Sequence, residues 1–252
     1  MSNPLIIYGV PFSQPVRAVL WLMLYKQKSF ELALINPGSS SEGGSRHPDY
    51  LAKFPTGTIP SIEDKESGFV LSESHAIMCY LCNKYNWTDL YPSNHEERAK
   101  IDSYLHLHHR NVREASIGLV APKVRKDLNF SEDFLKISQA NIEKAFKALE
   151  NGWLAQSRFL TGDNLTIADM SAYVEIGQLQ SKFTNVYDFE PLPNITRWLE
   201  EMNQVAYHDE VHASLYELGD ISSEAPSMET IISANKKGFA VIKAQLRSII
   251  DQ

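Results

Sequence analysis

The hydrophobic pattern of this chain changes near residue 90, and that change constrains the fold more than any other feature. Before it, short apolar runs typical of strands alternate with helical periodicity. After Tyr91-Pro92, apolar residues recur at helical spacing and no convincing strand appears. The sequence therefore predicts an α/β domain over residues 1–86, a linker over 87–95 and an all-helical region over 96–252.

The first domain is expected to have the order strand–helix–strand, followed by a hairpin and a last helix. Since the early strand–helix–strand unit implies a right-handed crossover, its two strands should be parallel. The expected strands are 5–8, 30–34, 59–62 and 69–71, and the expected helices begin at Pro15 and cover 74–85, 96–113, 131–149, 167–179, 194–203 and 228–250.

The net charge of -7 arises entirely beyond residue 86, because residues 1–86 carry equal numbers of acidic and basic side chains. Binding of nucleic acid requires a basic footprint, which this distribution does not provide. The chain also shows no secretory signal and no apolar run long enough to span a membrane. We therefore expect a cytoplasmic protein with no nucleic-acid or membrane partner.

Two groups of residues could suggest a metal or redox site, but both patterns are incomplete. Cys79 and Cys82 lie within an apolar helical run and lack the second ligand pair that zinc requires, so we interpret them as packing thiols. His106, His108 and His109 lie on one expected helix without a carboxylate or cysteine at ligand spacing. They are interpreted as a partly solvated face, and no metal is expected.

Ser13 stands directly before the first expected helix, in the sequence Pro11-Phe12-Ser13-Gln14-Pro15. The unpaired N–H groups and positive dipole of a helix start favour an anion such as a thiolate. A hydroxyl donor there would lower a thiol pKa further, and a drop of about two units corresponds to about 2.7 kcal/mol. The local pattern equally allows Ser13 to serve only as a helix cap.

Two later segments offer groups that could bind a peptide-like ligand. Pro60 either starts a strand or follows a cis bond, which would turn the Ile59 backbone outward toward an extended peptide. At the next helix start, Ser74 could cap the helix and bind a carboxylate, while Glu73 could accept an ammonium group. The simpler interpretation is a trans proline and a solvated glutamate ahead of a serine cap.

Taken together, these segments resemble the cytosolic glutathione transferases of the theta-like, serine-type class. The sequence from Ser13 to Arg17 resembles the S-Q-P-x-R active-site motif, and Ser72–Ile77 resembles the E-S-x-A-I glutathione-binding motif. Leu160–Asp169 resembles the family's capping-box signature, in which Thr166 and Asp169 form the box. The resemblance implies a thioredoxin-like domain containing cis-Pro60, then a helical domain whose extension, Gly219–Gln252, folds over the active site.

The same resemblance implies glutathione as co-substrate and a homodimer, with no metal. It assigns Ser13 as hydrogen-bond donor to the glutathione thiolate, and Tyr8 is the competing residue. It further implies that Ile59, beside Pro60, contacts the cysteinyl backbone, while Glu73 and Ser74 hold the γ-glutamyl end.

Recognition of the glycyl carboxylate departs from the family pattern, because Thr58 stands where many theta-like members carry lysine. Arg46, His47 and Lys53 are the candidates, with Arg46 slightly ahead of the others.

The activity implied is conjugation of glutathione to small electrophiles, largely apolar, as in detoxification. The alternative is a catalytically weak binding or regulatory module that keeps the same fold. Thiol–disulfide or dehydroascorbate chemistry is disfavoured, because no cysteine lies near Ser13.

Overall fold

The computed structural model describes residues 5–125 and 128–251, which form two compact units. The first unit contains the chain up to Tyr85, the segment Ala206–Ser214 and the chain from Asn235 onward. The second contains Asn86–Val205 and Leu215–Ala234. The compact units are therefore not divided at one point in the sequence, because two late segments belong to the first unit.

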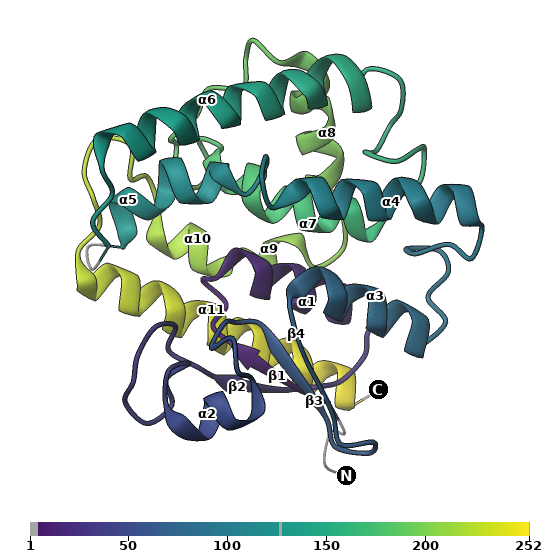
Figure 1. Cartoon of the computed structure of the whole chain (residues 1–252), viewed down its shortest axis with the longest axis vertical. Coiled ribbons are helices and arrows are strands. Elements are labelled where there is room, and N and C mark those ends of the chain that lie inside the picture. The colour runs from purple at the N-terminus through teal and green to yellow at the C-terminus, as the bar shows by residue number, and fades with distance from the viewer. Residues whose placement is uncertain (1–4, 126–127, 252) are drawn as a thin grey trace. The chain divides into compact units, whose positions relative to one another are not determined.

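The first unit has a four-stranded sheet with the order β2-β1-β3-β4, in which β1 pairs parallel to β2 and antiparallel to β3 (Figure 1). Strands β3 and β4 form the predicted antiparallel hairpin. The predicted α/β architecture is confirmed. Its elements are β1 (Leu5–Gly9), α1 (Gln14–Tyr25), β2 (Glu31–Leu34), α2 (Pro48–Lys53), β3 (Ser61–Asp64), β4 (Phe69–Ser72) and α3 (Ser74–Lys84).

Successive side chains of β1 point to opposite faces of the sheet, and both faces are covered by other parts of this unit. Leu5 and Ile7 are fully buried, and helices α1 and α3 pack against one another beside the sheet. Tyr8 points to the other face of the sheet. There its ring contacts the rings of Tyr50, which lies in α2, and Phe54, which follows α2 directly. The short helix α2 was not predicted, because six residues are too few to show a helical period.

The second unit is built from helices, as predicted. Its core contains the buried side chains of Phe146, Tyr173 and Trp198. Helix α4 ends at His108, earlier than the expected Arg113, and is followed by the π-helical segment η1. The elements are α4 (His95–His108), η1 (Ala115–Val120), α5 (Ala121–Val124), α6 (Glu132–Ala148), η2 (Leu149–Trp153), α7 (Ile167–Ile176), η3 (Gly177–Leu179) and α8 (Pro193–Asn203).

Three further helices lie beyond Val205: α9 (His208–Val211), α10 (Ala213–Leu218) and α11 (Met228–Ile250). Only α11 was predicted, since α9 and α10 are too short to show periodicity. Residues 219–227 between α10 and α11 have no helix or strand, as expected for this loop. Across the described residues, no helix combines the length and apolarity that crossing a membrane would require.

The predicted capping box at the start of α7 is confirmed. The Asp169 carboxylate accepts hydrogen bonds from the Thr166 backbone N–H at 3.0 Å and from the Thr166 hydroxyl at 2.9 Å. It also accepts the Leu160 N–H at 2.8 Å and the Trp198 indole N–H at 3.1 Å. One buried carboxylate therefore joins the α7 start, the preceding loop and α8.

We expect Asp169→Asn to lower the free energy of unfolding by about 1–2 kcal/mol, because the amide would place N–H donors against buried N–H donors. Urea unfolding followed by far-ultraviolet circular dichroism measures the loss. The exposed Asp163 in the same loop is a matched control, and Asp163→Asn should change stability by less than about 0.5 kcal/mol. An Asp169→Asn protein as stable as the wild type would contradict this role.

Candidate active site

Three sequence-predicted segments meet at one edge of the sheet, as the strand register requires. Tyr8 near the end of β1 pairs with Ser61 at the start of β3, and Ser61 pairs with Ser72 at the end of β4. The Ser61 and Ser72 hydroxyls also lie 2.7 Å apart. The loop after β1, the residues before β3 and the residues after β4 therefore leave the sheet at the same edge.

Ser13 occupies the N-cap position of α1, with an extended backbone at φ -72° and ψ 126°. Its backbone N–H donates to the Val10 carbonyl at 3.0 Å, and its carbonyl accepts the Arg17 N–H at 2.9 Å. The half-buried side chain, however, makes no capping hydrogen bond. The helix-cap interpretation therefore describes the Ser13 backbone but not its hydroxyl, which remains available to a ligand beside the first N–H groups of α1.

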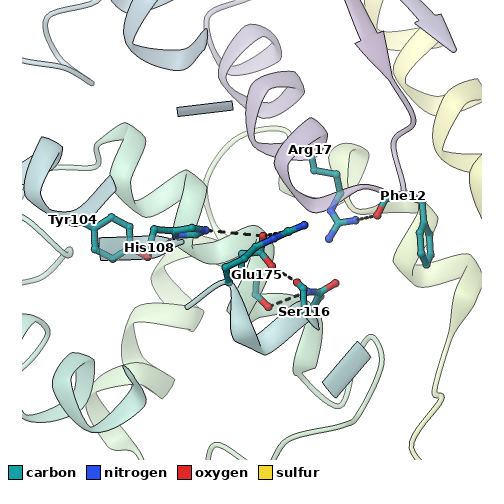
Figure 2. A network of polar contacts seen from close by, with 8 residues as sticks. Phe12, Arg17, Tyr104, His108, Ser116 and Glu175 are labelled. Carbon is teal, nitrogen blue, oxygen red and sulfur yellow. Dashed lines mark hydrogen bonds and ion pairs between the residues drawn. The ribbon is translucent and has the colours of Figure 1, made fainter. Parts of the chain in front are cut away.

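The loop that carries Ser13 is anchored by Arg17, a fully buried residue on α1. Its guanidinium Nη1 donates to the Phe12 carbonyl at 2.6 Å, as Figure 2 shows. A buried charge requires such hydrogen-bonding partners. Arg17 thus holds the peptide immediately before Ser13, a role that the motif alone did not reveal.

Tyr8, the competing residue, is engaged with a carboxylate. Its hydroxyl donates to Glu63 Oε2 at 2.7 Å, and Lys53 Nζ binds the same oxygen at 2.7 Å. Burial, the hydrogen bond to Glu63 and the charge of that carboxylate raise the pKa of Tyr8 above its usual value. Since its proton is directed at Glu63, Tyr8 is poorly placed to donate to a thiolate.

The peptide bond between Ile59 and Pro60 is cis, as the resemblance described above implied. Ile59 is half-buried and packs against the cluster formed by Ile35, Tyr50 and Phe54. The Tyr50 hydroxyl donates to the Thr58 carbonyl at 2.7 Å and so fixes the backbone just ahead of Ile59. The approach to Pro60 is therefore rigidly supported from α2.

Glu73 and Ser74 lie where β4 passes into α3. Glu73 takes the N-cap position and Ser74 is the first helical residue, so the expectation that Ser74 caps this helix was wrong by one position. Glu73 is exposed and has φ 76° and ψ 113°, a conformation that costs a non-glycine residue about 1–3 kcal/mol. Strained residues of this kind cluster at functional sites, and this one lies directly between β4 and α3.

The three candidates for the glycyl carboxylate have different local partners. His47 caps α2, because its Nδ1 accepts the Asp49 N–H at 3.3 Å. Lys53 forms the ion pair with Glu63. Arg46 is exposed and donates from Nη1 to the Thr56 carbonyl at 3.4 Å, which leaves the other donors of its guanidinium for a ligand.

A second polar cluster lies in the helical unit and was not predicted. Glu175 of α7 is fully buried, and its carboxylate accepts a hydrogen bond from the Ser116 hydroxyl, as Figure 2 shows. It also pairs with the Arg113 guanidinium. Gln178 bonds the same serine hydroxyl and donates to the Glu175 carbonyl at 3.0 Å. Burial opposes the charge on Glu175, but Arg113, His108 and Ser116 outweigh it and lower its pKa to about 2. The sequence signal was a glutamate near the end of a mostly apolar helix.

The histidine cluster is only partly the solvated face that was predicted. His106 and His109 are exposed, but His108 is buried, with Nε2 4.0 Å from Glu175 and Nδ1 3.2 Å from the Tyr104 hydroxyl. Burial lowers the pKa of His108, and the neighbouring Glu175 offsets part of that effect.

The two cysteines do not form a disulfide. Cys82 is buried and Cys79 half-buried, and both thiols are reduced. Within residues 5–125 and 128–251, no group of three or more His, Cys, Asp or Glu side chains is arranged to hold a metal ion.

Comparison with known proteins identifies the family. Residues 7–93 match the profile "Glutathione S-transferase, N-terminal domain", and residues 107–205 match "Glutathione S-transferase, C-terminal domain". The chain belongs to the glutathione S-transferase family. Its fold class, a thioredoxin-like domain with a helical C-terminal domain, is confirmed by these matches.

Individual relatives place this transferase-family chain near the theta class. Glutathione S-transferase T3 of Arabidopsis thaliana is 30% identical over 92% of this chain, which spans 40% of that protein's length. Human glutathione S-transferase theta-1 is 27% identical, over 86% of this chain and 91% of its own. The crystal structure of glutathione transferase F2 from Populus trichocarpa has a TM-score of 0.71 and 29% identity, over 82% of this chain and 97% of its own.

Proposed function

We propose that this protein is a glutathione transferase in which the Ser13 hydroxyl donates a hydrogen bond to the glutathione thiolate. The observation that carries the proposal is the position of Ser13 at the N-terminus of α1 with no capping bond from its side chain. A thiolate placed there gains the α1 N–H groups and helix dipole as well as the hydroxyl. Family membership and the theta-class relatives support glutathione conjugation as the activity.

The chemistry requires little of the protein beyond this activation. The thiol proton passes to solvent, and the thiolate sulfur forms a bond to an electrophilic carbon. The bond to a leaving group then breaks, or the electrophile takes up a proton if the reaction is an addition. Because the nucleophile belongs to glutathione, the chain supplies a hydrogen bond, a positive helix end and orientation.

The sheet edge supplies the rest of the glutathione site. Ile59, before cis-Pro60, would pair with the cysteinyl backbone of the bound tripeptide. Glu73 would bind the γ-glutamyl ammonium group, and the N–H groups around Ser74 at the α3 start would bind its carboxylate. The convergence of these segments in the strand register supports this arrangement.

Arg46 is proposed to bind the glycyl carboxylate, because its guanidinium keeps donors beyond the Thr56 carbonyl while His47 and Lys53 have local roles. We expect Arg46→Ala to raise the KM for glutathione about fivefold to tenfold with kcat nearly unchanged, as loss of one exposed charge-assisted contact implies. Initial-rate kinetics at varied glutathione measure this. His47→Ala and Lys53→Ala are the comparisons, and a larger KM effect in either would assign the carboxylate to that residue instead.

The test of the function itself uses the wild-type chain. Three results would support it. Calorimetry should show that glutathione binds, the pKa of the bound thiol should be lower than that of free glutathione, and at least one electrophile from a chemically varied panel should be conjugated. Binding without turnover on the whole panel would favour the alternative, a regulatory or binding module. Absence of glutathione binding would refute both.

The remaining assignments are also proposals. The second substrate is a small, largely apolar electrophile, and the protein acts in the cytoplasm as a homodimer, as is usual in the family. Light scattering of the purified protein tests the oligomeric state. A monomeric mass at micromolar concentration would contradict the dimer.

A further inference from the structure

We propose that Gly238 on α11 is a positioning residue for Ser13, and that its missing side chain allows the catalytic loop to adopt its working geometry. This inference rests on the proposed function, because it concerns how the Ser13 hydroxyl is aimed. It is carried by contacts among residues of the first unit alone, to which both α11 from Asn235 onward and the Ser13 loop belong.

The loop that carries Ser13 is a closed turn. The Ser13 N–H donates to the Val10 carbonyl at 3.0 Å, which closes a four-residue turn with Pro11 and Phe12 at its centre. The Phe12 carbonyl is held by Arg17 at 2.6 Å. With both ends of the turn tied, a displacement of Pro11 is transmitted to Ser13 and cannot be absorbed within the loop.

Helix α11 approaches that turn closely at Gly238. A Cβ added to Gly238 would lie 3.0 Å from the Pro11 Cβ and 3.0 Å from the Ser214 Cβ. Ordinary carbon–carbon contacts are about 3.5–4.0 Å, so neither neighbour could remain where it is. With glycine at position 238, the α11 backbone lies this near to Pro11 without such a displacement.

Ser214, the other neighbour of Gly238, has little freedom to move. It is fully buried, and its hydroxyl lies 3.4 Å from the Pro11 carbonyl. Its segment, Ala206–Ser214, is fastened to α1 by a 2.9 Å hydrogen bond from the Trp21 indole to the Ala206 carbonyl. Because α9 within this segment also packs against α1, we expect a side chain at position 238 to displace Pro11 instead.

Gly238→Ala and Gly238→Val in the full-length chain test the inference. We expect the pKa of the bound glutathione thiol, read from thiolate ultraviolet absorbance, to rise by about 0.3–0.5 unit for alanine and about one unit for valine. At neutral pH, kcat/KM should fall about threefold and tenfold respectively, with KM for glutathione changing less than about twofold. A merely structural role would not shift the thiol pKa.

Two controls separate packing from helix propensity. Ala244→Val puts the same valine at an exposed position of α11, and Gly152→Ala adds a methyl where nothing lies within 4 Å. Both should leave the thiol pKa unchanged. If both Gly238 variants fold, by circular dichroism, and keep the wild-type thiol pKa, the positioning role is refuted; if valine prevents folding, alanine alone decides.

The double variant Ser13→Ala with Gly238→Val distinguishes this inference from the proposed function. If Gly238 acts through Ser13, the valine should have no further effect on the thiol pKa once the hydroxyl is gone. A full additional shift in the double variant would mean that Gly238 acts by another route and would overturn the inference. If Ser13→Ala alone leaves the thiol pKa unchanged, the proposed function fails, whatever the Gly238 variants show.

Discussion

Replacing Ser13 with alanine should raise the pKa of the bound glutathione thiol by about two units and lower kcat/KM by up to about 100-fold at a pH below both thiol pKa values. The variant removes the hydroxyl donor, while the α1 N–H groups and dipole remain, because the backbone of the cap is held by Val10 and Arg17. Thiolate absorbance against pH gives the pKa, and steady-state kinetics with a fixed electrophile gives the rate loss. The KM for glutathione should change little, since the contact proposed for Ser13 is with the sulfur.

The pH dependence of this loss provides an internal check. A raised thiol pKa reduces the thiolate fraction tenfold per unit only while the pH lies below both pKa values. The wild-type and Ser13→Ala rates should therefore converge as the pH rises above the thiol pKa of the variant. A constant ratio across the pH range would show that Ser13 positions the sulfur without lowering its pKa.

Tyr8→Phe is the matched comparison, because Tyr8 is the other hydroxyl near the end of β1. Its hydroxyl already donates a hydrogen bond to Glu63, so the thiol pKa should stay within about 0.3 unit of the wild type. Loss of that hydrogen bond should instead lower stability by about 1 kcal/mol. A large rise of the thiol pKa in Tyr8→Phe, with none in Ser13→Ala, would exchange the proposed roles.

The second large effect is expected from Arg113→Ala, which should lower the free energy of unfolding by about 3 kcal/mol at pH 7. Among the described residues, removing the guanidinium leaves the fully buried Glu175 carboxylate with the Ser116 hydroxyl and the more distant His108 ring as partners. Because the Arg113 side chain is 29% exposed, we take the lower end of the range observed for broken buried pairs. Arg110→Ala removes an exposed arginine nearby and should cost less than about 0.5 kcal/mol.

The sign of the pH effect follows from the lowered pKa of Glu175. A carboxylate whose pKa falls from 4.5 to about 2 on folding contributes stability above pH 4.5 and loses it as the pH falls toward 2. The arginine is the largest of the influences that lower this pKa, so the difference between wild type and Arg113→Ala should shrink over that interval. Urea unfolding at several pH values measures it, and a difference independent of pH would contradict the ion-pair explanation.

Much of the fold could be predicted because it is encoded locally. Apolar periodicity marked the four strands and the long helices, and Thr166 with Asp169 marked the start of α7. The errors occurred where local pattern carries no information. Helices α2, α9 and α10 are too short to show a period, and α4 ends at His108 although the apolar spacing continues.

The candidate site was predicted as separate pieces, and the sequence alone could not show whether they meet. Ser13, Ile59-Pro60 and Glu73-Ser74 converge because of the pairing of Tyr8 with Ser61 and of Ser61 with Ser72, a property of the sheet. The assignment of Glu73 instead of Ser74 to the N-cap position depends on the backbone conformation at Glu73. Neither can be read from residue types.

The sequence by itself determined the strands, the long helices, the family and the presence of a hydroxyl at the start of α1, because these depend on residue type and on local spacing. Tertiary structure alone decided the state of that hydroxyl and its surroundings. Ser13 leaves the cap bond unmade, the Tyr8 hydroxyl donates its hydrogen bond to Glu63, and Gly238 approaches Pro11 across more than 200 residues of sequence. These features arise from contacts between distant segments, and the energy of such contacts depends on geometry that local sequence does not specify.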